Sequence, residues 1–241
     1  MRPLTFALLN RWLALAALTC LPIVPVAAQN GPDDWVGTKD DFLQACKVDN
    51  PGRIDYLFKQ GIDPNVVEPE RNDSCLLLAV REDSMRALRA ILKIPGVNLE
   101  HTARNGDSAI MLAAFKGNME AVKTLLDKGA KVNRSGWTAL HYGAASGNTA
   151  ILKLLLAHQA QVDAPAPNGT TALMMAARGG HIYSVKLLLD AGADPLLKNQ
   201  QGYDAIEMAK LFNNTDIVEG LQYQIKKRAA AKAAASGSGA Q

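Results

Sequence analysis

The chain contains none of the short motifs that mark common catalytic or nucleotide-binding sites. It has no Gly-rich phosphate loop, no Gly-x-Ser-x-Gly nucleophile motif, no His-Glu-x-x-His zinc motif and no Cys-x-x-Cys pair. Each of these motifs places amides, a nucleophile or metal ligands at a spacing that its chemistry requires. We therefore expect a protein that is not an enzyme and that uses no cofactor or metal.

The chain also lacks a strong charge of either sign. Its formal net charge is +3 over 241 residues, and the positive excess lies near the two ends, with Arg2 and Arg11 at one end and residues 226–232 at the other. A nucleic-acid-binding protein concentrates many lysines and arginines on one face to neutralise phosphates. We therefore expect no nucleic-acid partner.

No apolar run after the first 28 residues is long enough to cross a membrane. Residues 1–28 themselves have the features of a signal peptide, because an apolar stretch follows Arg11 and the small residues Val26, Ala27 and Ala28 suit a cleavage site. We expect cleavage after Ala28, secretion or export to the periplasm of a Gram-negative bacterium, and no stable membrane insertion afterwards.

Two alternatives for this leader are weaker. An uncleaved anchor is disfavoured because the apolar run is about 17 residues long, against roughly 20 needed to span a bilayer. Pro22 and Pro25 also interrupt the run. Lipid attachment at Cys20 is disfavoured because Thr19 stands where such motifs have a small glycine, alanine or serine.

Two stretches of the chain repeat each other at an interval of about 33 residues. Residues 136–148 read GWTALHYGAASGN and precede the apolar run 151–156, while residues 169–181 read GTTALMMAARGGH and precede the apolar run 185–189. Self-similarity at about this period indicates a solenoid of stacked units.

The repeated pattern resembles the ankyrin repeat, whose consensus is G-x-T-P-L-H-x-A-A-x-x-G-H followed by an apolar helix. The resemblance implies an all-α solenoid of about six helix-turn-helix units joined by short β-hairpin fingers. The threonine caps the first helix of a unit, and glycines such as Gly147 and Gly180 allow the chain to reverse with a left-handed conformation. Alanine replaces the consensus proline at Ala109, Ala139, Ala172 and Ala205.

The register follows from residues that favour a helix N-cap. These recur at Asp41, Ser74, Ser108, Thr138, Thr171 and Asp204. We therefore predict a repeat domain over 40–222, with units starting near 38, 71, 105, 135, 168 and 201. The interval before Thr138 is 30 residues, against 34 before it and 33 after it, which predicts a shortened finger between Val132 and Trp137.

The two flanks of the repeat domain have different compositions. Residues 29–39 are polar and contain glycine and proline, so we expect a flexible lead-in. Residues 223–241 are rich in alanine and basic residues and then in glycine and serine, so we expect a frayed helix that passes into a disordered tail. In the last unit, Asn213 stands where a helix-ending glycine is expected, and asparagine tolerates the left-handed conformation.

The histidines and cysteines have structural interpretations. The resemblance implies that His141 and His181 hold loops together by hydrogen bonds. Cys46 and Cys75 differ by about one helical turn in the repeat register, ~6 Å along the axis, and a helix separation of ~8–10 Å would place them too far apart for a disulfide. We therefore expect two buried free thiols. The alternative function is a thiol-based redox sensor or small enzyme that uses Cys46 and Cys75.

The resemblance implies a protein-protein interaction module that binds its partner through the finger tips and the concave face of the first helices. We expect a monomer; a scaffold or protector of a co-secreted enzyme is a further alternative. The expected partner-binding residues lie just before the cap or seven to eight residues after it: Arg81, Arg104, Asp107, Phe115, Lys116, Arg134, Trp137, Arg178 and Tyr203, together with Asp73, Asn105 and Phe212. Trp137 has a second interpretation, in which it folds over the short loop and shields a neighbour.

Overall fold

The computed structural model describes residues 37–237, so the predicted signal peptide and residues 29–36 of the lead-in lie outside the described part. The described residues form twelve helices joined by turns, which follow one another as α1 (Lys39–Lys47), α2 (Pro51–Lys59), α3 (Cys75–Arg81), α4 (Met85–Ile91), α5 (Ala109–Lys116), α6 (Met119–Asp127), α7 (Ala139–Ser146), α8 (Thr149–Ala157), α9 (Ala172–Arg178), α10 (Ile182–Asp190), α11 (Ala205–Leu211) and α12 (Thr215–Gly237). This order confirms six helix-turn-helix units.

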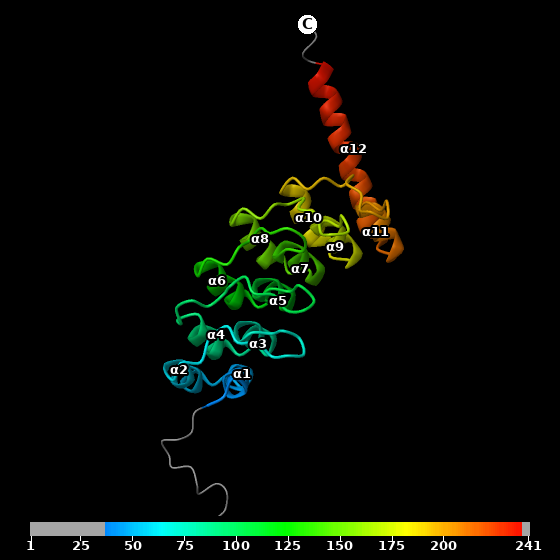
Figure 1. Cartoon of the computed structure of the whole chain (residues 1–241). Coiled ribbons are helices and arrows are strands. Elements are labelled where there is room, and N and C mark those ends of the chain that lie inside the picture. The colour runs from blue at the N-terminus through cyan, green and yellow to red at the C-terminus, as the bar shows by residue number, and fades with distance from the viewer. Residues whose placement is uncertain (1–36, 238–241) are drawn as a thin grey trace, which may run out of the picture. The chain divides into compact units, whose positions relative to one another are not determined.

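The helices stack in two columns (Figure 1). The first helices of the units, from α1 to α11, each pack on the first helix of the next unit, and the second helices from α2 to α12 do the same. Large buried side chains such as Ile54, Leu88, Leu125, Leu155 and Leu188 form one continuous apolar core between the columns. Because each unit contacts only its neighbours, the stability of the domain is approximately a sum of unit and interface contributions.

Helix N-caps lie where the sequence predicts them in five of the six units, at Ser74, Ser108, Thr138, Thr171 and Asp204. The first unit differs. Thr38 is the N-cap of α1, with its hydroxyl accepting the Asp41 amide at 3.2 Å, while the Asp41 carboxylate accepts the Thr38 amide at 2.8 Å. Asp41 is therefore the third helical residue of a capping box, and the prediction that it is the N-cap is wrong. The hydrogen bond from the Thr38 amide lowers the pKa of Asp41.

The left-handed positions are confirmed. Gly147 ends α7 with φ of 72°, and a side chain at this position would clash with the His181 ring. Asn213 has φ of 58° in the last unit, as expected for a residue that replaces glycine.

The fingers are loops rather than β-hairpins. Among residues 37–237 there is no strand, and the fingers carry only the isolated bridges Val67 to Ser74 and Thr102 to Ser108. The shortened finger is present, since the connection between α6 and α7, residues 128–138, is three residues shorter than that between α8 and α9, residues 158–171.

The frayed helix expected near the C-terminus is a continuous helix as far as Gly237, and residues 238–241 of the expected disordered tail lie outside the described part. Helix α12 continues to Gly237 and extends beyond α10 and α11 (Figure 1). Alanine, lysine and arginine all have high helix propensity, which favours this continuation. Arg228 also attaches the helix to the stack, because its guanidinium donates to the carbonyl oxygens of Leu189 at 2.7 Å and Ala193 at 2.8 Å at the end of α10.

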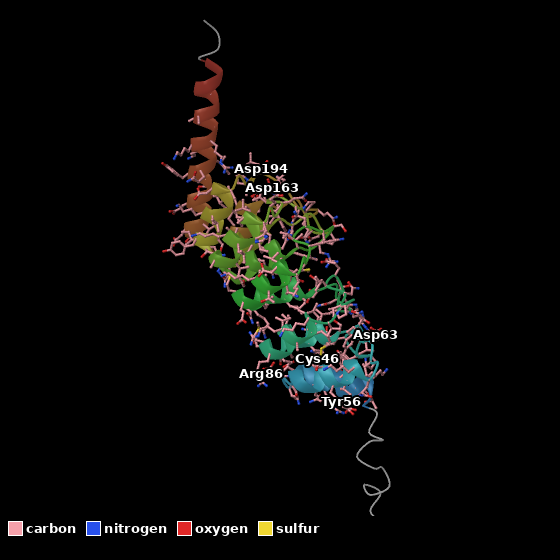
Figure 2. The ribbon with its side chains drawn as sticks, turned by 90° about the vertical axis from the view of Figure 1, so that its left-hand side faces the viewer. Cys46, Tyr56, Asp63, Arg86, Asp163 and Asp194 are labelled. Atoms are coloured by element: carbon pink, nitrogen blue, oxygen red, sulfur yellow. A yellow bond between two sulfur atoms is a disulfide. The ribbon has the colours of Figure 1, made fainter. Side chains whose placement is uncertain are left out.

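Cys46 and Cys75 form a disulfide, so the prediction of two free thiols is wrong. Their Cα atoms are 5.4 Å apart, and the bond joins α1 of the first unit to α3 of the second. Cys46 lies near the N-terminal end of the stack (Figure 2). Helices α1 and α3 are not separated by a full helix distance at this point, because the last turn of α1 closely approaches the first turn of α3. Both cysteines are fully buried. The redox-sensor alternative required accessible thiols, which these two residues do not provide.

No helix within 37–237 combines the length and the apolarity needed to cross a membrane. The same residues contain no group of three or more histidine, cysteine or carboxylate side chains arranged to hold a metal ion.

Candidate functional site

Two histidines hold loops together, as the sequence predicts. His141 is buried in α7; its Nδ1 accepts the Thr138 amide at 3.2 Å, and its Nε2 lies 3.0 Å from the Thr170 carbonyl, to which it donates. These partners require the tautomer protonated on Nε2, and burial lowers the pKa of His141. His181 Nε2 similarly donates to the Ala145 carbonyl at 2.9 Å. Both side chains therefore have structural roles that link successive units.

Three aromatic side chains gather beside His141. Phe115 on α5 and Tyr142 on α7 meet edge to face with ring centroids 6.1 Å apart, and Trp137 packs edge to face against Tyr142 at 6.4 Å and His141 at 5.3 Å. With Ala145 and Met175, they line a hollow of about 240 Å³. Phe115 remains 54% exposed. Trp137 is half-buried, so it both shields its neighbours and lines the hollow.

Tyr142 is a site residue that the sequence analysis missed. Its hydroxyl donates to the carboxylate of Asp107, which also accepts the Asn105 side-chain amide at 2.7 Å. Desolvation, together with the neighbouring Asp107 carboxylate, raises the pKa of Tyr142. An aromatic residue four positions after the cap Thr138 was the available signal, but the expected binding positions were those just before a cap and those seven to eight residues after it.

Asp107 and Asp73 differ from the prediction that they are accessible finger residues. Asp107 is only 6% exposed because Tyr142 of the next unit covers it. Asp73 is fully buried and accepts two hydrogen bonds from Arg81, from Nε at 2.8 Å and from Nη2 at 3.2 Å. Both carboxylates therefore orient neighbouring side chains, and neither projects from a finger.

Basic side chains gather next to the aromatic ones. Arg104 is exposed and donates from Nη2 to the Pro69 carbonyl at 2.8 Å, and its own amide donates to the Arg71 carbonyl at 2.7 Å. Lys116 pairs with Asp83 at 2.9 Å and donates to the Arg81 carbonyl at 2.7 Å. With Arg81 held by Asp73 and Arg71 lining the same hollow as Arg104, four basic residues gather around α3, α5 and their fingers.

Three adjoining hollows join these groups into one groove. The first, about 390 Å³, lies at the fingers and includes Arg71, Arg81 and Arg104. The second, about 360 Å³, shares Arg81 with the first and includes Lys116, Phe115 and Tyr142. The aromatic hollow shares the last two residues. We call this continuous surface over α3, α5 and α7 the basic-aromatic groove.

The remaining predicted residues lie elsewhere or have other contacts. Arg134 is half-buried, with Nη1 3.4 Å from the Gly106 carbonyl and 3.5 Å from Met111 Sδ. Tyr203 is half-buried in the last finger. Arg178 is exposed on α9 and lies 4.9 Å from the ring centroid of Phe212, outside the groove. The structure thus brings Arg81, Arg104, Asp107, Phe115, Lys116 and Trp137 together. Arg134 borders this group, because it contacts Gly106 next to Asp107 and its charge acts on Tyr142. Tyr203 and Arg178 lie apart from it.

Comparison with known proteins gives a consistent result. The family described as "Ankyrin repeats (3 copies)" matches residues 42–133, 76–166 and 159–231. The chain is 32% identical over 177 residues to human "SH3 and multiple ankyrin repeat domains protein 2", covering 71% of this chain and 10% of that protein. It is 29% identical over 177 residues to the mouse "B-cell lymphoma 3 protein homolog", covering 70% and 39%. It is 32% identical over 179 residues to the mouse "Nuclear factor NF-kappa-B p105 subunit", covering 69% and 18%. The chain therefore spans well under half the length of each of these relatives.

Proposed function

The chain belongs to the ankyrin-repeat family, and from this premise we propose that it is a non-catalytic, monomeric module that binds a partner protein in the basic-aromatic groove. Ankyrin repeats imply protein-protein interaction, but the family alone says nothing about which surface of this chain is used. The groove is the surface that the geometry favours.

One observation carries this proposal: Phe115 is a large aromatic residue that is 54% exposed at the junction of two hollows. Its contact with Tyr142 leaves more than half of the Phe115 side chain in solvent, so packing alone does not explain a large aromatic residue at this position. Aromatic and arginine side chains supply most binding hot spots in protein interfaces, and here both types line one groove.

We expect Phe115→Ala to weaken binding of the partner by at least about tenfold, because truncating an aromatic hot spot costs on the order of 2 kcal/mol. Phe212→Ala is the matched control, since Phe212 is 47% exposed and lies outside the groove. Partner proteins would be isolated from a periplasmic extract on the immobilised wild-type chain. Their affinities would then be measured for the wild type, Phe115→Ala and Phe212→Ala. Equal losses for both variants, or no loss for Phe115→Ala, would contradict binding in the groove. Trp137 is less suitable because it also packs on His141 and Tyr142.

We also propose that the protein acts in the periplasm or outside the cell. The leader features of residues 1–28 support export, and the disulfide between Cys46 and Cys75 adds independent support, because disulfides persist mainly in oxidising compartments.

For this location, we expect the mature protein to begin at Gln29 and to fractionate with soluble periplasmic proteins. The small residues Val26, Ala27 and Ala28 provide the cleavage site. Intact-mass measurement of the protein purified from its host tests this expectation. Retention of Met1 to Ala28 in a membrane fraction would overturn it.

A further inference from the structure

The two halves of the groove differ in chemistry, and this difference specifies a ligand more closely than a general protein partner. The aromatic hollow of about 240 Å³ is smaller than the ~300–1,000 Å³ typical of small-molecule pockets. It is lined mostly by Phe115, Trp137, Tyr142 and Met175. Its size and lining suit a single large aliphatic or aromatic side chain.

The basic half presents oriented cationic donors. Asp73 holds Arg81 through Nε and Nη2, which leaves at least three of the five guanidinium N–H groups for other partners. Arg81 lines both of the first two hollows, and the exposed Arg71 and Arg104 flank it on adjoining fingers. A guanidinium that is already fixed by a buried carboxylate loses little freedom when it binds a second carboxylate.

The acidic residues of the groove do not cancel this preference. Asp107 lies in the second hollow, but it is buried and its two carboxylate oxygens accept hydrogen bonds from Tyr142 and Asn105. Glu70 is exposed at the rim beside Arg71. Asp83 pairs with Lys116, so the arginines are the principal donors available to a ligand.

The spacing of the two halves follows from the stacking. Packed helices lie ~8–10 Å apart, so the aromatic hollow between α5 and α7 lies roughly 10–20 Å from the arginines around α3 and its finger. An extended peptide advances ~3.3 Å per residue, so roughly three to six residues cover this distance.

We propose that the groove binds an extended segment of the partner protein in which one large apolar or aromatic residue is separated by about three to six residues from one or two carboxylates. This inference rests on the proposed function and specifies the ligand of the same site. Single-stranded nucleic acid would also combine stacking with basic contacts. The peptide is favoured because the three rings meet edge to face around a hollow, whereas base stacking needs open ring faces.

The test selects peptides of about twelve residues, long enough to span the groove, from a random phage-displayed library on the immobilised full chain. We expect enriched peptides to pair an aromatic or large aliphatic residue with aspartate or glutamate at the stated spacing. Their affinity should fall at least about tenfold for Phe115→Ala and for Arg104→Glu, and by less than about twofold for the matched controls Phe212→Ala and Arg178→Glu outside the groove. Replacing the peptide carboxylate with lysine should restore binding to Arg104→Glu.

Several results would overturn the inference: no enrichment, enrichment of basic residues, or enriched peptides that bind all variants equally. An oligothymidylate that competes for the groove would indicate nucleic acid as the occupant. A different result would refute the proposed function itself: capture of the native partner by Phe115→Ala at full affinity. If capture of the native partner is lost while the library yields no such peptides, the groove binds a folded surface instead, and only the inference falls. Thermal melts of every variant exclude unfolding as the cause.

Discussion

Replacing Leu155 with alanine is expected to lower the free energy of unfolding by about 2–5 kcal/mol. Leu155 lies on α8 in the middle of the stack and is fully buried, so the truncation removes apolar contacts and leaves a cavity. Leu188→Ala on α10 should have a similar effect for the same reason. Urea unfolding followed by circular dichroism measures both changes.

Two further variants provide comparisons for the size of the Leu155→Ala effect. Leu196→Ala removes the same side chain where it is 58% exposed and should change stability by no more than about 0.5 kcal/mol. Thr138→Ala removes a buried hydroxyl 2.9 Å from His141 Nδ1 and should cost about 0.5–2 kcal/mol. A larger loss for Thr138→Ala than for Leu155→Ala would contradict the burial described for α8.

Removing the disulfide with Cys46→Ala and Cys75→Ala is expected to destabilise the protein by about 2–4 kcal/mol, because the bond closes a loop in the unfolded chain. The two residues are 29 apart in the sequence and join the first two units. Urea unfolding of both proteins, with and without dithiothreitol, measures the effect. The reductant should bring the wild type to the stability of the double variant and leave the variant unchanged.

The disulfide would be contradicted if the wild type, denatured without reductant, showed two reactive thiols. That result, or equal stability of the two proteins under oxidising conditions, would show that the disulfide does not form in solution.

The sequence predicts those parts of the fold that depend on local chemistry. The N-caps at Ser74, Thr171 and Asp204 follow from side chains that accept amides of their own helix, so a short window of sequence contains the whole interaction. At the start of α1, Thr38 and Asp41 are both suitable caps, and the choice depends on the reciprocal pair that they form.

The features that the sequence did not predict depend on contacts between units. The disulfide depends on how closely α1 crosses α3, which the repeat period does not specify. The burial of Asp107 depends on Tyr142, which lies 35 residues away. The groove was therefore only partly predictable. Offsets from the caps located Phe115 and Arg81, but Phe115 packs on Tyr142 of the next unit, and Arg81 is oriented by Asp73, whose burial the offsets did not indicate.

The contact of Arg228 with α10 affects how the molecule opens. A terminal unit of a solenoid has a neighbour on one side only, so its amides are normally the first to exchange with solvent and its backbone the first to reach a protease. The two hydrogen bonds from Arg228 to Leu189 and Ala193 give the last unit a second attachment to the one before it. Fraying of α12 as far back as Leu221 then requires breaking these bonds as well as the apolar packing. This attachment slows the route by which a protease would enter the stack from its C-terminal end.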